Sequence, residues 1–202
     1  LDHVRSKAPG ACATVSELTG SFNRTTCWLA TEVVLARSES QRVLVVERTV
    51  EVMEAMLELR NFRGVIAALS ALRLPCIARL ARTWRAVSRK HHDFLERVEQ
   101  LFDPSHNWRE YRAVVHRAVA PFVPFEGIIF SDCLGIAENA DRVGGRVNYE
   151  KLALFAAELT IVQRAQSKSY AADESADFAA FMAQRVVLDE DAIYDAARRV
   201  QH

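Results

Sequence analysis

The sequence lacks both a long apolar run and a surplus of either charge. No uninterrupted apolar segment approaches the ~18 residues that a membrane-spanning helix requires, so no direct membrane span is expected. The 26 basic and 26 acidic side chains give a formal net charge of zero. A protein that binds nucleic acid by neutralising phosphates needs an excess of lysine and arginine, so no nucleic-acid partner is expected.

Clustered cysteines and the common hydrolytic motifs are missing as well. The four cysteines, Cys12, Cys27, Cys76 and Cys133, include no CxxC pair, which argues against a zinc site or a dense disulfide framework. HExxH, Glu-x-x-His and GxSxG do not occur, so a helical metalloenzyme and a serine hydrolase are both disfavoured. We therefore expect no metal and no cofactor, and reduced thiols in a cytoplasmic protein.

What the sequence does contain is helical periodicity over most of its length. Apolar residues recur every three or four positions in 43–57, 84–101, 152–162 and 178–197. No segment alternates apolar and polar residues for long enough to predict a strand. With half of its 202 residues hydrophobic, the chain can bury one sizeable core. The sequence therefore predicts a single all-α domain.

One pair of predicted helices forms a hairpin. Residues 127–138 and 147–165 both have helical patterns, and a short glycine-containing turn over 139–146 separates them. On the first helix, Leu134 and Glu138 lie one turn apart. They face away from the apolar stripe of Ile129, Cys133, Ile136 and Ala140. On pattern alone, a surface leucine beside a solvated glutamate explains this pair better than a functional site does.

Six short motifs follow one another along the chain. They are FN at 22–23 followed by Trp28, LRNF at 59–62, IARL at 77–80 leading to Thr83-Trp84, DPSHNWREYR at 103–112, PFEG at 124–127 and NYEK at 148–151. Each motif alone is a weak signal, but their order and spacing resemble those of the catalytic domain of Ras-type guanine-nucleotide exchange factors, the RasGEF family. The resemblance covers roughly residues 20–200. It implies a RasGEF-like catalytic core over 22–202, with the hairpin at about 127–165.

The chain departs from the family pattern in three places. About two helices usually precede the FN motif, so residues 1–21 are expected to be a lead-in at a truncated start. Arg60 and Arg63 stand where the family commonly has asparagines. Glu126 and Ile129 stand where it commonly has an aliphatic residue and a tyrosine. The substitutions around Asn61 leave a Ras, a Rap and a Ral-like partner all open.

The resemblance also implies a function. The chain would bind a Ras-type small GTPase and promote GDP release by inserting the hairpin, displacing the nucleotide non-covalently rather than acting as an enzyme that makes or breaks bonds. Leu134 and Glu138 are the catalytic residues that this resemblance implies. Asn61 and Lys151 would bind the GTPase. From the residues alone, Asn61 is also explained as a helix N-cap, and Lys151 as a surface lysine at a helix start.

Six further residues of these motifs are expected to support the hairpin: Phe22, Asn23, Trp84, Phe125, Asn148 and Tyr149. The alternative function is a catalytically inactive module of the same fold that docks or allosterically regulates a GTPase. The expected location is the cytoplasm, and flanking domains could recruit the chain to the inner membrane surface.

Overall fold

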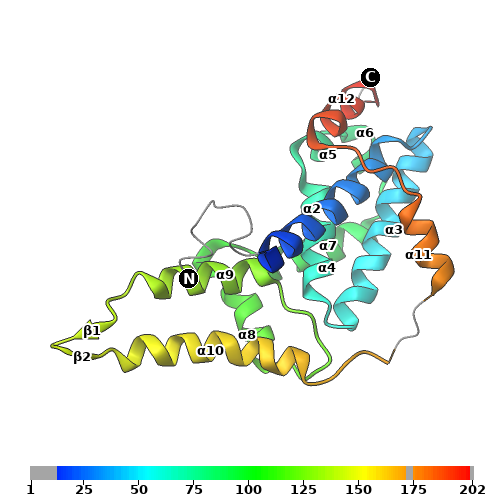
Figure 1. Cartoon of the computed structure of the whole chain (residues 1–202). Coiled ribbons are helices and arrows are strands. Elements are labelled where there is room, and N and C mark those ends of the chain that lie inside the picture. Colours follow the sequence, from blue (N-terminus) through cyan, green and yellow to red (C-terminus); the bar gives the residue numbers. More distant parts are fainter. Residues whose placement is uncertain (1–12, 172–174, 201–202) are drawn as a thin grey trace.

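The computed structural model describes residues 13–171 and 175–200 of the chain, and the described part is almost entirely helical (Figure 1). The helices are α2 (Ala13–Val34), α3 (Glu39–Glu58), α4 (Phe62–Arg73), α5 (Pro75–Ala78), α6 (Ala81–Ala86), α7 (Arg89–Leu101), the 3₁₀ turn η1 (Ser105–Asn107), α8 (Arg109–Arg117), α9 (Glu126–Ala137), α10 (Tyr149–Gln166), α11 (Ala176–Ala183) and α12 (Glu190–Val200). The prediction of an all-α domain with a protruding helical hairpin is confirmed. None of these helices is long and apolar enough to cross a bilayer.

The core of the body forms around α4, which packs against α2 and α3. Val65, Ala68 and Leu72 of α4 are at most 1% exposed, because an apolar face at helical spacing is covered from both sides. Phe62, the first residue of α4, is equally buried and packs edge-to-face on Tyr111 of α8, with 5.8 Å between the ring centroids. This pair links the body to the helix on which the hairpin rests.

The C-terminal helix α12 closes the body at the end away from the hairpin (Figure 1). Ile193 and Ala197 are buried against α2 and α5. Asp189 accepts a hydrogen bond from the backbone N–H of Ala192 (2.9 Å) and thereby caps the first turn. The predicted division of the chain at residue 22 falls inside α2, which is continuous from Ala13 to Val34.

The helices α9 and α10 run side by side and project from the body as the hairpin (Figure 1). Their connection contains two strands that the sequence did not predict, β1 (Arg142–Val143) and β2 (Arg146–Val147), paired antiparallel. Gly144 and Gly145 have φ angles of +58° and +77°, which is the backbone of the two-residue turns that fit tight β-hairpins. Two-residue strands are too short to show an alternating pattern, so the segment was expected to be a plain turn.

Candidate functional site

The base of the hairpin is joined by backbone hydrogen bonds to the turn before α4. The N–H of Val123 donates to the carbonyl of Arg60 (3.0 Å), and the N–H of Arg63 donates to the carbonyl of Val123 (3.3 Å). Arg60 has a φ of +57°, which turns the chain sharply between α3 and α4. The turn that carries Asn61 and the segment that leads into α9 therefore form one structural unit.

Asn61 is the N-cap of α4. Its Oδ1 accepts a hydrogen bond from the backbone N–H of Gly64 (2.9 Å), which satisfies one of the donors that a helix start leaves free. The side chain is half-buried. The cap explanation offered by the sequence is thus present in the structure. The predicted contact of Asn61 with a GTPase stays a prediction.

Two phenylalanines pack at the base of the hairpin. The ring centroids of Phe22 and Phe125 lie 5.3 Å apart. The backbone N–H of Phe125 donates to the hydroxyl of Tyr111 (2.8 Å). Burial raises the pKa of Tyr111 to about 12, so the hydroxyl stays neutral. A Cβ atom on Gly127 would lie 2.5 Å from the Phe125 ring, so a glycine is needed where the ring folds back over α9.

Other residues predicted to support the hairpin lie elsewhere. Trp84 is in α6, beside α5 at the end of the body away from the hairpin, and its Nε1 donates to the carbonyl of Ile77 (2.9 Å) (Figure 1). Asn23 is exposed on α2. Tyr149 starts α10 next to the strands and is 77% exposed, so it is not packed at the base of the hairpin. The order of the motifs along the sequence did not predict where these three side chains lie in the fold.

The far end of the hairpin is closed by Lys151 and Asn148. Lys151 is only 9% exposed, and its Nζ donates to the carbonyls of Ala137 (2.9 Å) and Asn139 (2.6 Å) and to Oδ1 of Asp141 (2.6 Å). These carbonyls lie at the negative end of the α9 dipole, where a cation is stabilising. The same contact lowers the pKa of Asp141.

Asn148 caps α10 by accepting from the N–H of Lys151 (3.1 Å), and its amide also donates to the carbonyl of Ala140 (2.9 Å). The structure thus places Lys151 inside the hairpin, where it holds the two arms together. Its predicted contact with a GTPase stays a prediction.

The two candidate catalytic residues lie toward the free end of α9. Ile128 and Ile129 are buried on the packing face of this helix, whereas Leu134 is half-buried and Glu138, the C-cap, is exposed. Phe130 precedes Leu134 by four residues and is also half-buried, so it belongs to the same stripe as Leu134 and Glu138. Phe130 is not among the site residues predicted from the sequence, although its four-residue spacing from Leu134 indicates the shared stripe.

Polar contacts also fix the hairpin to α8. Both terminal nitrogens of Arg112 contact the carboxylate of Asp132, one of them at 2.7 Å, and this pairing raises the pKa of Arg112. Arg164 of α10 donates to the carbonyls of Val115, His116 and Ala118, each at 2.9 Å. The sequence placed Arg112 in a motif but gave no sign of its partner on α9.

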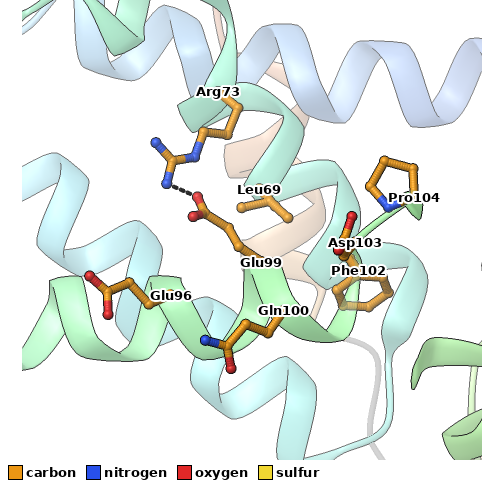
Figure 2. Close-up of a pocket in the computed structure, with 8 residues that line it drawn as sticks. All are labelled: Leu69, Arg73, Glu96, Glu99, Gln100, Phe102, Asp103 and Pro104. Atoms are coloured by element: carbon orange, nitrogen blue, oxygen red, sulfur yellow. Dashed lines mark ion pairs between the residues drawn. The ribbon is translucent and has the colours of Figure 1, made fainter. Parts of the chain in front are cut away.

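A pocket of about 550 Å³ lies away from the hairpin, between α4 and the end of α7. Figure 2 shows Arg73 and Glu99 pointing toward each other across it, and they form an ion pair. Burial lowers the pKa of Arg73. The pocket opens to solvent, and none of the residues that line it belongs to the hairpin.

Comparison with known proteins gives a consistent result. The profile of the RasGEF domain matches residues 1–153. The chain is 27% identical over 203 residues to Ras guanine nucleotide exchange factor Q of Dictyostelium discoideum, a match that covers 98% of this chain and 16% of that protein. It is 29% identical over 148 residues to human Rap guanine nucleotide exchange factor 6, covering 72% of this chain and 9% of that protein.

A third relative is the Rap guanine nucleotide exchange factor of Caenorhabditis elegans. It is 32% identical over 152 residues, which are 74% of this chain and 10% of that protein. The chain therefore spans at most about a sixth of the length of these relatives.

Proposed function

The chain belongs to the RasGEF domain family, and on this basis we propose that it binds a Ras-type small GTPase and accelerates the release of GDP. The observation that supports this function best is the projecting hairpin, whose first helix carries the half-buried Leu134 and the exposed Glu138 toward its free end. The relatives include both Ras and Rap guanine nucleotide exchange factors, so Ras- and Rap-like GTPases are the first partners to test, followed by Ral-like ones. A cytoplasmic location, with recruitment to the inner membrane surface, belongs to the same proposal.

The proposed mechanism is non-covalent. A small GTPase holds its nucleotide through Mg²⁺ and through a loop of backbone N–H groups and a lysine that surround the phosphates. Leu134 would place an apolar group, which cannot coordinate a metal, in the Mg²⁺ and inner-phosphate region. Glu138 would place negative charge where phosphate oxygens bind, and like charges repel strongly at low dielectric. Each ~1.4 kcal/mol removed from the barrier to release gives a tenfold faster rate.

The contacts within the hairpin support this mechanism, because a wedge has to keep its shape while it displaces a ligand. Lys151 joins the two arms at the far end, and Arg112 and Arg164 join the arms to α8. Interactions that are formed before binding do not have to be ordered during it, so more of the binding free energy is available to displace the nucleotide.

Asn61 is the proposed second contact with the GTPase. It lies in the turn that is hydrogen-bonded to the start of the hairpin, and a side-chain amide can donate and accept at once. Asn61→Asp keeps the oxygen that caps α4 and removes the amide donor, so it should weaken GTPase binding while the melting temperature stays near that of the parent. Asn61→Ala would lose the cap as well and cannot separate the two roles.

The experiment that tests the function is release of fluorescent GDP from a panel of Ras-, Rap- and Ral-like GTPases, with GTPase binding measured separately. Leu134→Ala and Glu138→Gln should each slow release about tenfold, equivalent to ~1.4 kcal/mol of barrier. The double variant should lose less than the sum of the two, because both residues act on one target. Leu44→Ala, which changes an exposed leucine on α3 outside the hairpin, serves as the matched control.

Two outcomes would contradict the proposal in different ways. Binding without accelerated release would identify an inactive docking module. A double variant of Leu134 and Glu138 that releases GDP as fast as the parent would show that these residues do not displace the nucleotide. Circular dichroism of every variant would establish that the helices remain folded.

A further inference from the structure

An ion pair at the base of the hairpin links α4 to α9. Nε of Arg63 lies 2.8 Å from Oε1 of Glu126, and the two side chains are only 20% and 15% exposed. Arg63 is the second residue of α4, and Glu126 is the first residue of α9. The pair therefore connects the start of the body's central helix to the start of the helix that carries Leu134 and Glu138.

Arg63 also reaches a third helix. One of its terminal nitrogens donates to the carbonyl of Leu18 in α2 (2.8 Å), and its guanidinium lies 5.9 Å from the centre of the Phe22 ring. The second carboxylate oxygen of Glu126, Oε2, is buried and has no hydrogen-bond partner among the described residues. The charge of Glu126 is therefore compensated chiefly by Arg63, and loss of either side chain would leave a poorly solvated charge.

Both side chains lie close to the turn that carries Asn61, where contact with a GTPase is proposed. The structure turns them toward each other instead, and each is mostly buried by residues of this chain. The pair is thus explained by contacts within the fold.

We propose that Arg63 and Glu126 form a positioning pair, which fixes the base of the hairpin relative to the turn that carries Asn61. The inference rests on the proposed exchange function, because it concerns how the hairpin is oriented toward the GTPase. Glu138 follows Glu126 by twelve residues, about 18 Å along a helix, so a tilt of about 10° at the base would move Glu138 by about 3 Å. A misplacement of about 1 Å can cost on the order of a hundredfold in rate.

The test compares breaking the pair with replacing it. Arg63→Met and Glu126→Leu each leave one buried charge uncompensated, whereas the double variant leaves none. In GDP-release assays over a series of GTPase concentrations, each single change should lower the maximal rate between about tenfold and about a hundredfold. The half-saturating GTPase concentration should stay within about twofold, because both side chains are mostly buried within this chain. The double variant should recover to within about threefold of the parent.

Amide hydrogen exchange over residues 130–134 provides a readout that does not require a GTPase, because these N–H groups donate to the carbonyls of the first turn of α9. Their protection should fall in both single variants and return in the double variant. Arg82→Met is the matched control. Nε of Arg82 lies 2.9 Å from Oε2 of Glu39, and the Arg82 side chain is 68% exposed and far from the hairpin. This variant should match the parent in both assays.

Three results would overturn the inference. One is a double variant at least as slow as the slower single. Another is a single variant that raises the half-saturating concentration while the maximal rate stays constant, since this would mean direct contact with the GTPase. The third is unchanged protection of 130–134 in the single variants. If the parent accelerates release from no GTPase, the proposed function fails, and hydrogen exchange alone then decides whether the pair positions α9.

Discussion

The body and the hairpin are stabilised by different kinds of contact. In the body, Val33, Val46, Val65 and Ile77 are completely buried, and apolar packing joins the helices. In the hairpin, the buried residues of α10 are Lys151, Glu158 and Ile161, so two of three carry ionisable groups. The leucines of α10 at 152, 154 and 159 are each about half exposed.

The two regions should therefore respond differently to substitution. Apolar burial is non-directional and contributes roughly 25 cal/mol for each Å² removed from water, so it determines whether the body folds. Hydrogen bonds and ion pairs depend on distance and angle, and each contributes little net stability. Changes in the body should therefore act mainly on stability, and polar changes in the hairpin mainly on its position.

The largest expected effect is in the body. Phe62→Ala removes a ring that is 1% exposed and packs on Tyr111, so it should lower the free energy of unfolding by ~3–5 kcal/mol. Chemical denaturation monitored by circular dichroism would measure this loss. Leu159→Ala is the contrasting variant. This leucine of α10 is 55% exposed, so its loss should change the free energy of unfolding by at most ~0.5 kcal/mol. Similar losses in both variants would contradict the comparison.

A smaller effect is expected at the free end of the hairpin. Lys151→Met keeps the aliphatic stem and removes the ammonium that binds the carbonyls of Ala137 and Asn139. Hydrogen bonds to a charged group contribute ~1.5–3 kcal/mol, and the pairing with the 88% exposed Asp141 should add little to this.

We expect this loss mainly as local opening. Hydrogen exchange should become faster over residues 137–151, while the body keeps its protection. Lys168→Met, at an exposed lysine just beyond α10, is the control and should leave both regions unchanged. If Lys151→Met instead lowers the protection of α4 as much as that of the hairpin, then the two regions unfold as one unit.

The sequence was sufficient to predict the hairpin because its signals are local. Helical periodicity and the glycine turn placed the first arm at 127–138 and the second at 147–165, and the structure has α9 at Glu126–Ala137 and α10 at Tyr149–Gln166. Periodicity depends only on neighbours three and four positions away, so it does not require knowledge of the tertiary fold.

Pairings between distant residues could not be predicted in the same way. Arg63 and Glu126 are 63 positions apart, and no pattern in the sequence links their charges. The burial of Lys151 likewise depends on the end of α9 folding back over it. The motifs also did not show that Trp84 packs far from the hairpin, because the order of motifs along a chain does not give their distances in space.

The smallest expected effect concerns Glu158, the other charged residue buried on α10. It lies near Asp132, Arg112 and His116, and its pKa is raised first by burial and then by the negative charge of Asp132, although Arg112 and His116 act in the opposite direction. The folded state therefore binds the proton of Glu158 more tightly than the unfolded state does. Stability must then fall as the pH rises from the ordinary glutamate pKa through the raised one.

Glu158→Gln removes this titration with little change of shape. The variant and the parent should melt at similar temperatures in acid, where Glu158 is protonated, and the variant should melt at the higher temperature near pH 7. Thermal melts across this range would measure the difference, and hydrogen exchange in α10 would locate it in the hairpin. A parent that is more stable than the variant near pH 7 would mean that attraction between Glu158 and Arg112 outweighs the cost of burial. In that case the attraction between Glu158 and Arg112 would stabilise the folded hairpin, as the other buried charges of this region do.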